Sequence, residues 1–310
     1  MNCQYAHLER EALLHIIGPD TLKFLQGQTT CDTRKVTPNH AVPGVFCTPQ
    51  GRAVCDFLLC ELGPDHFALR MRRDIRASSS AAFGKYIIFS KAKLDDTRED
   101  WATYAVWGPG ASKALGGIFG EAPTEHFGAT RGDGFVLVQT DEQGEQFECY
   151  LQSASSAARL ALMAELIQSG SEPEWEIQQI KNGIARIEAA TVEEFVPQTL
   201  NYDRTGHISF NKGCYTGQEV VARLHYLGKP KRRTYVAELP PLTNCAAGTA
   251  VCDAVSGQRV GAIVNCCTTQ GNTHALVAAT DGGVANGLHL ASRDGPLLTL
   301  GELPYTLDTD

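Results

Sequence analysis

The stretch that most constrains this chain is KGCYTGQE, residues 212–219, which places a cysteine between two glycines ahead of a predicted helix. Thr216 and Glu219 have the T-x-x-E spacing of a capping box, in which the hydroxyl and the carboxylate satisfy backbone amides at the helix start. An apolar helical face is then predicted from Val220, Val221, Leu224 and Leu227. Gly228 is expected at C′, and Pro230 prevents continuation of the helix.

Cys214 is the candidate reactive residue of this stretch. It lies two residues ahead of the predicted N-cap, and Lys212 lies two residues before it. The helix dipole and a nearby ammonium group both favour thiolate over thiol, while Tyr215 can shield the sulfur. The alternative is that Cys214, one of eleven cysteines, only packs, as most free cysteines do. Spacing alone does not decide between these interpretations.

The eight-residue motif, with Arg223 behind it, resembles the signature of the YgfZ family. Members are folate-binding relatives of the glycine-cleavage T-protein (aminomethyltransferase) and support iron–sulfur enzymes. Further segments resemble the family at residues 18–30, 49–52, 186–189 and 195–198, so the likeness runs from about residue 10 to residue 233. It implies tetrahydrofolate or a related folate as the cofactor. It also implies cytoplasmic iron–sulfur enzymes, such as tRNA methylthiotransferases, as indirect or transient partners.

The resemblance also implies site residues. Cys214 and Lys212 are the catalytic candidates. Glu188, in an R-x-E setting with Arg186, is expected to hold the pterin ring, because a carboxylate can accept two coplanar N–H donors; the alternative is an exposed glutamate near Arg186. The remaining folate-binding candidates are Gln198, Asp56, Tyr215, Gln218, Arg223 and Arg233. Gln198, with its neighbours Asn201 and Asp203, could bond either the motif loop or a ligand.

Two departures from the family pattern bear on activity. T-proteins carry two adjacent acids after the first hairpin turn, whereas this chain has Cys55 and Asp56, which makes aminomethyl transfer doubtful. Some relatives place a folate-stacking tryptophan where this chain has Glu11. Three functions therefore stay open: folate-dependent support of [4Fe–4S] enzymes and thereby of tRNA modification, folate-dependent aminomethyl transfer, and a non-enzymatic folate-responsive adaptor.

A local basic cluster is formed by Lys229, Lys231, Arg232 and Arg233. It could steer an anionic folate tail, a tRNA or an acidic partner, or it could be a solvated linker. The whole chain carries a net charge of −8, which disfavours duplex nucleic acid as a primary ligand, because phosphate contacts supply most of the affinity of such proteins.

Composition restricts the remaining classes. An apolar content of 43% and a charged content of 20% are typical of a globular protein. No apolar run is long enough to cross a bilayer, and residues 1–7 have neither the basic nor the apolar region of a signal peptide. With no C-x-x-C pair, no local metal site is expected, and the cysteines are expected to be free thiols in a reducing compartment.

The predicted fold is α+β and similar to T-protein and YgfZ: two ferredoxin-like α+β domains and a small C-terminal β-barrel around a central cavity. The domains are placed at residues 1–100, 101–228 (with the motif) and 229–310, and the first two may interleave. A strand, Gly-Pro and helix pattern at residues 17–19 and 107–109 suggests two related halves. Helices are expected at 74–87, 155–168 and 174–186, and barrel strands at 233–239, 249–254, 259–267, 272–280, 287–291 and 296–303.

Overall fold

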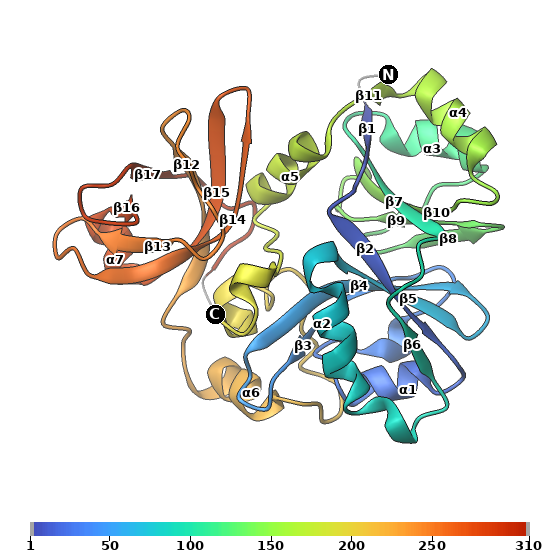
Figure 1. Ribbon diagram of the computed structural model, residues 1–310, viewed down its shortest axis with the longest axis horizontal. Coiled ribbons are helices and arrows are strands. Elements are labelled where there is room, and N and C mark those ends of the chain that lie inside the picture. Colours follow the sequence, from blue (N-terminus) through green and yellow to red (C-terminus); the bar gives the residue numbers. More distant parts are fainter. Residues whose placement is uncertain (1–2, 308–310) are drawn as a thin grey trace. The chain divides into compact units, whose positions relative to one another are not determined.

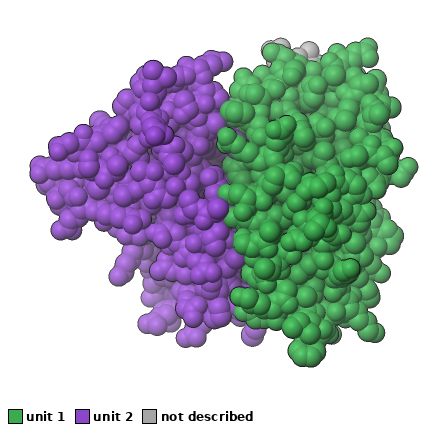
Figure 2. Space-filling model, viewed as in Figure 1, with its two compact units in different colours: residues 1–44, 57–175 green, residues 45–56, 176–310 purple. Residues whose placement is uncertain are grey.

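The computed structural model describes residues 3–307. Met1 and Asn2, which belong to the segment searched for a signal peptide, lie outside the described residues. The chain forms two compact units, coloured in Figure 2: unit 1 comprises residues 1–44 and 57–175, and unit 2 comprises residues 45–56 and 176–310. Unit 2 therefore takes a short segment from the N-terminal third of the chain, a feature that becomes important for the site.

Unit 1 contains a six-stranded sheet covered on one side by helices. Its order is β11-β1-β7-β10-β9-β8. The strands are β1 (Gln4–His7), β7 (Trp101–Trp107), β8 (Ala129–Gly132), β9 (Phe135–Gln139), β10 (Gln146–Gln152) and β11 (Gln168–Ser169). Helices α3 (Ala111–Phe119) and α4 (Ala157–Leu166) pack against each other, and α3 also packs on β10.

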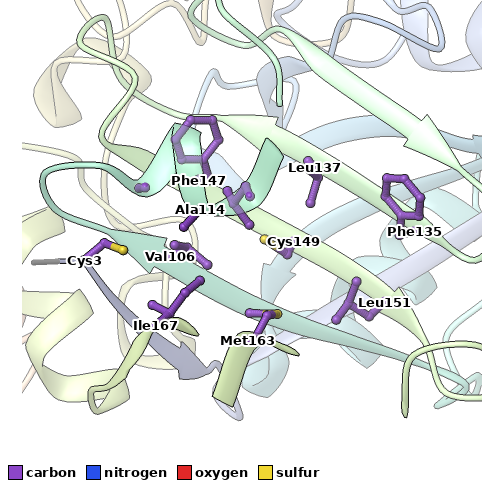
Figure 3. Close-up of a cluster of buried hydrophobic side chains, with 12 residues drawn as sticks. Cys3, Val106, Ala114, Phe135, Leu137, Phe147, Cys149, Leu151, Met163 and Ile167 are labelled. Atoms are coloured by element: carbon purple, nitrogen blue, oxygen red, sulfur yellow. The ribbon is translucent and has the colours of Figure 1, made fainter. Parts of the chain in front are cut away.

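The core of this sheet lies under these two helices. Phe147, Cys149 and Leu151 alternate along β10 and point to the same side, where Met163 of α4 joins them (Figure 3). The alternation puts these three side chains on one face of β10. Glu148 and Tyr150, which lie between them in the sequence, are buried on the opposite face, so both faces of this strand are covered.

The second sheet of unit 1 has five strands in the order β3-β4-β5-β2-β6. The strands are β2 (Glu11–Ile17), β3 (Val42–Cys47), β4 (Ala53–Gly63), β5 (His66–Arg72) and β6 (Lys93–Asp95). Helix α2 (Arg73–Gly84) packs on β2, β5 and β6, and α1 (Thr21–Gln26) packs beside the 3₁₀ turn η1 (Thr33–Lys35). The distal ends of β3 and β4 belong to unit 2.

The predicted repeat is present in unit 1. In both halves a strand ends at a glycine with positive φ, Gly18 (φ +138°) after β2 and Gly108 (φ +102°) after β7, and a helix follows. Pro19 lies before the helix that follows Gly18. Helix α1 begins two residues later, at Thr21, whose hydroxyl donates to the Gly18 carbonyl.

Glu11, where relatives can carry a stacking tryptophan, is buried in an ionic network of unit 1. Its carboxylate lies 3.2 Å from the Arg72 guanidinium and 3.7 Å from that of Arg70. Arg70 also pairs with Glu148 at 2.7 Å, and the Tyr150 hydroxyl donates to the same carboxylate. A buried charge is tolerated only when it is paired and hydrogen-bonded, so Glu11 contributes to the packing of this unit.

Unit 2 contains a closed barrel, drawn in orange and red in Figure 1, with the strand order β12-β15-β14-β13-β16-β17. The strands are β12 (Arg233–Leu239), β13 (Ala250–Asp253), β14 (Arg259–Thr269), β15 (Asn272–Ala279), β16 (Leu288–Leu290) and β17 (Leu297–Leu300), with α7 (Asp281–Asn286) before β16. Pairing of β12 with β17 closes the barrel around an aliphatic core. The six predicted strands and the predicted fold class are thus confirmed.

Several helices differ in length from the prediction. Helix α5 (Glu172–Lys181) ends five residues before the expected position, and α4 and α2 are also shorter than expected. The 3₁₀ turns η2 (Ile87–Phe89), η3 (Ala189–Thr191) and η4 (Pro197–Leu200) follow α2 or α5. Glu188 therefore lies in the loop between α5 and η3. No helix within residues 3–307 is both long enough and apolar enough to cross a membrane.

Candidate functional site

The segment 186–188 is anchored in unit 2 by Asp56, at the end of the segment that this unit takes from β4. The Asp56 carboxylate accepts from the Arg186 Nε at 2.5 Å and from the Ile187 amide at 2.6 Å. Asp56 is 1% exposed and Arg186 is 7% exposed, so this is a buried ion pair. Because the carboxylate also binds a backbone amide, it fixes the path of the chain into Glu188 as well as the arginine side chain.

Asn265 holds the same segment from the barrel side. Its Oδ1 accepts from the Arg186 amide at 2.8 Å, and its Nδ2 donates to the Arg186 carbonyl at 2.9 Å and to the Glu188 Oε1 at 2.7 Å. Asn265 lies on β14 at a register shift after Ile263, an irregularity that re-aims a side chain. Half-buried Glu188 is thereby oriented by a neutral amide.

Sequence reasoning missed Asn265. The local signal is a polar residue within the apolar part of β14, between Val260 and Cys267.

The motif loop is built against the turn at residues 48–52, also within unit 2. Gly217 has φ +83°, and a Cβ there would lie 2.5 Å from the Thr48 carbonyl oxygen. Gly51 has φ +72°, and its Cβ would lie 2.7 Å from the Val220 Cβ. Both glycines are therefore required by backbone conformation and by close approach. Gly213 differs, because a Cβ there meets nothing within 4 Å.

Helix α6 (Gln218–Leu227) begins within the motif, at Gln218, and the prediction that Thr216 is its N-cap is wrong. Gly217, and not Thr216, is the N-cap, and a glycine has no side chain with which to cap the helix. The reason is the left-handed conformation of Gly217, which a threonine at the N-cap would not supply. Val221 is buried as expected, whereas Leu227 is 83% exposed, and Gly228 is extended (φ −153°) and not left-handed.

Cys214 is the one solvent-exposed cysteine of the eleven, all of which are free thiols. Next to it, Tyr215 is buried, and the Lys212 Nζ lies 5.0 Å from the centre of the Tyr215 ring. Burial raises the pKa of the Tyr215 hydroxyl above its ordinary value. The loop therefore anchors one aromatic ring under a lysine and leaves the neighbouring thiol accessible to a reactant.

The buried cysteines contrast with Cys214. Burial raises the pKa of the Cys47, Cys60 and Cys149 thiols far above the ordinary range. Thiols in such surroundings stay protonated and are inert as nucleophiles. Among these positions, accessibility therefore selects Cys214.

Gln198 and Arg233 form a second polar group in unit 2. Arg233 makes a bidentate pair with Asp203, at 2.6 and 3.0 Å, and donates to the Gln198 carbonyl at 2.8 Å. The Gln198 Nε2 donates to the Val221 carbonyl of α6, while its buried Oε1 accepts no hydrogen bond from the residues that the structure describes. Gln198 thus bonds the motif helix, and Arg233, 6% exposed, is not part of a solvated basic cluster.

The structure therefore divides the candidate residues into groups. Asp56, Arg186 and Glu188 come together with Asn265. Gln198 and Arg233 join η4, α6 and β12 through hydrogen bonds. On α6 itself, Gln218 is half-buried and Arg223 is exposed. Within the described part of the chain, no set of three or more His, Cys, Asp or Glu side chains could hold a metal ion.

The chemistry of two side chains is compatible with a folate. The half-buried Glu188 carboxylate, which accepts a hydrogen bond from Asn265, could also accept from the N–H groups of a pterin, and the buried Gln198 Oε1 is a second acceptor, without a hydrogen bond from the described residues. Asp56 and Arg186 are bound to each other, which makes them positioning residues for Glu188. Arg223 remains a candidate for an anionic ligand on the ground of its charge and exposure.

Comparison with known proteins places the fold and the family. Residues 6–133 match the family model described as the GCVT N-terminal domain. The solved structure of the glycine cleavage system aminomethyltransferase T from Bartonella henselae superposes with a TM-score of 0.71 at 14% identity, covering 98% of this chain and 86% of that one. At that identity the likeness shows the fold.

Curated relatives extend over most of the chain. The tRNA-modifying protein YgfZ of Pectobacterium atrosepticum is 31% identical over 74% of this chain and 68% of its own length. The protein of the same name from Sodalis glossinidius is 30% identical over 97% of this chain and 92% of its own length. The chain therefore belongs to the YgfZ family.

Proposed function

We propose that this chain binds tetrahydrofolate or a related folate through Glu188 and, with Cys214, supports the assembly or repair of [4Fe–4S] enzymes that modify tRNA. The relatives named above are called tRNA-modifying proteins. Clients of this chain would be iron–sulfur enzymes such as tRNA methylthiotransferases, contacted transiently in the cytoplasm. Bound folate would supply a carrier of one-carbon units.

The observation that carries the proposal is the way in which neighbouring side chains hold Glu188 in place. Two buried side chains, Asp56 and Asn265, form hydrogen bonds that fix the path and orientation of a three-residue segment, and this segment ends in the half-buried Glu188 carboxylate. Orientation of an acceptor by neighbouring side chains is characteristic of binding sites, because it removes the entropic cost of ordering the group when the ligand arrives.

A binding measurement with two variants tests the assignment. Replacement of a carboxylate acceptor by an amide removes a charge-assisted hydrogen bond worth about 1.5–3 kcal/mol. Glu188→Gln should therefore weaken tetrahydrofolate binding roughly tenfold to a hundredfold in anaerobic titration calorimetry. Glu193→Gln, at an exposed loop position five residues on, is the matched control and should bind as the parent does. Equal affinities for Glu188→Gln and the parent would remove the assignment.

Aminomethyl transfer is the less favoured activity. The single acid that follows the first hairpin turn, Asp56, is 1% exposed and is bound to the Arg186 guanidinium and to a backbone amide. Because both oxygens of the Asp56 carboxylate already accept hydrogen bonds from the protein, this group is not placed to accept a proton from a substrate. Turnover of an aminomethyl-lipoyl carrier by the purified protein would restore this activity as the leading candidate.

A non-enzymatic adaptor makes a different prediction for the thiol. If Cys214 takes part in chemistry at the folate site, its rate of alkylation should change when tetrahydrofolate is added. Slow labelling in both states would favour an adaptor that acts only through protein contacts.

A further inference from the structure

Three aromatic rings gather at the C-terminal end of α6, the end farther from the motif. The Phe210 and His225 rings stack with 3.6 Å between their centroids and 10° between their planes. The Tyr226 ring meets both nearly edge-on, with centroid distances of 6.3 Å to Phe210 and 4.6 Å to His225. All three residues belong to unit 2. We call these three rings the α6 aromatic cluster.

The α6 aromatic cluster lies at the surface. Tyr226 is 64% exposed, and the next residue, Leu227, is 83% exposed. His225 is also exposed, while Phe210 is half-buried. A single exposed apolar residue is ordinary on a folded protein, whereas several that adjoin one another commonly mark a binding surface. The cluster is therefore a candidate site for a ligand that packs against aromatic rings.

Positive side chains border the cluster. Arg223 precedes Tyr226 by three residues and Leu227 by four, so these side chains are neighbours on one face of α6. Arg223 is exposed, as are Lys229 and Lys231 in the segment that runs from α6 to β12 (Figure 1). Cations thus flank the rings both along the helix and in the chain that leaves it.

The local charge balance is opposite to that of the whole chain. Residues 210–232 contain five lysines and arginines and one acidic residue, Glu219, whereas the chain has a net charge of −8. Glu219 lies in the first turn of α6, and two rings of the cluster lie in the last turn. An anionic ligand is therefore attracted to the end of the helix that carries the rings.

Rings and cations together select the class of ligand. A nucleic-acid base has a flat π-face that stacks on an exposed aromatic ring, and the phosphates beside it pair with lysine and arginine. A base within a duplex is already stacked between its neighbours, so only an unpaired base can use the rings in this way. A folate glutamate tail or an acidic peptide would use the charges and leave the rings without a partner.

We propose that the α6 aromatic cluster and its flanking cations bind unpaired nucleotides of RNA. A base stacks on the exposed Tyr226 ring, and the neighbouring phosphates contact Arg223, Lys229 and Lys231. The choice of RNA rests on the proposed function, because its client enzymes act on tRNA, but binding at this surface requires no folate. The RNA docks on the helix that begins in the KGCYTGQE motif.

Fluorescence anisotropy in the absence of folate tests the proposal. The probe is a labelled single-stranded RNA of about 12 nucleotides, within the range of site sizes known for single-strand binding. The parent protein should bind it at least tenfold more tightly than the same RNA annealed to its complement. Tyr226→Ala should weaken binding roughly fivefold to a hundredfold through the lost stacking. Tyr86→Ala, which removes an exposed tyrosine of unit 1, is the matched control and should bind as the parent does.

The salt dependence of binding tests the cations. Each phosphate contact on a single strand contributes about 0.7 to the slope of log K against log salt, so Lys229→Gln with Lys231→Gln should reduce that slope by about 1.4. Lys91→Gln with Lys93→Gln, a pair of exposed lysines in unit 1, should leave the slope unchanged.

A folate titration separates this proposal from the proposed function. Tyr226→Ala should keep the folate affinity of the parent, and a parent protein that binds RNA but not folate would overturn only the proposed function. Three results would overturn the RNA surface: Tyr226→Ala binds the RNA as tightly as the parent, the parent prefers the duplex, or polyglutamate of equal charge competes as well as unlabelled RNA does.

Discussion

Removal of the Asp56 carboxylate should destabilise unit 2 more than any exposed charge substitution does. In Asp56→Ala the Arg186 guanidinium, 7% exposed, loses its buried partner, and the Ile187 amide loses its acceptor. Removal of one partner of a buried ion pair costs about 3–5 kcal/mol, because the other charge stays uncompensated. We expect a loss of about 4 kcal/mol of unfolding free energy.

A double substitution separates the charge from the packing. Arg186→Met in the Asp56→Ala background removes the buried guanidinium that has lost this carboxylate, so the double variant should be more stable than the sum of the two single losses predicts. Asp294→Ala, at an exposed position of the barrel, is the matched control and should change stability by no more than about 0.5 kcal/mol.

The assay can distinguish the two units. All three tryptophans, Trp101, Trp107 and Trp175, lie in unit 1, so their fluorescence in a urea titration reports that unit. Far-UV circular dichroism reports both units, and hydrogen exchange at the Ile187 amide reports the contact itself. Faster exchange at Ile187 is expected in Asp56→Ala. The reasoning is refuted if Asp56→Ala costs no more than Asp294→Ala and leaves the Ile187 amide protected.

Three further predictions follow from single positions. Gly217→Ala should destabilise the protein by at least about 1–2 kcal/mol in urea denaturation, because φ is +83° and the new Cβ would lie 2.5 Å from the Thr48 carbonyl oxygen; Gly213→Ala should be nearly neutral. Burial lowers the pKa of His15 to about 4 from 6.5, so its contribution, about 3 kcal/mol, is complete above pH 6.5 and is lost as the pH falls toward 4; His15→Asn should flatten this part of the stability curve. Cys214 should react with iodoacetamide before the eight buried cysteines, as mass mapping of partly labelled protein can show.

The parts of the fold that depend on local signals could be predicted from the sequence. The barrel strands are separated by Gly, Asn, Asp and Pro, and their predicted positions agree with β12–β17 to within a few residues. The strand, glycine and helix repeat was also visible, because Gly18 and Gly108 mark a turn that requires positive φ. The short strands β1 and β11 were missed, since a run of two to four residues carries little periodic signal.

The candidate site could be predicted only as far as its residue types. The sequence alone places Gly217 inside a capping box. Its positive φ and its close approach to the Thr48 carbonyl, far away in the sequence, become apparent only in the folded unit. Asn265 could not be identified for the same reason, because its partners at 186–188 come together with it only in the folded unit. The exposure of Cys214, in contrast to the buried cysteines, also depends on tertiary packing.

Complementation with Cys214→Ala measures most directly whether the accessible thiol on the KGCYTGQE loop carries the function. Because Cys214 is exposed, the variant should keep the stability of the parent protein. In a bacterial strain that lacks its own YgfZ-family protein, the parent chain should restore methylthio-modified tRNA, and Cys214→Ala, expressed at the same level, should not. Full restoration by Cys214→Ala would contradict a functional role for this sulfur.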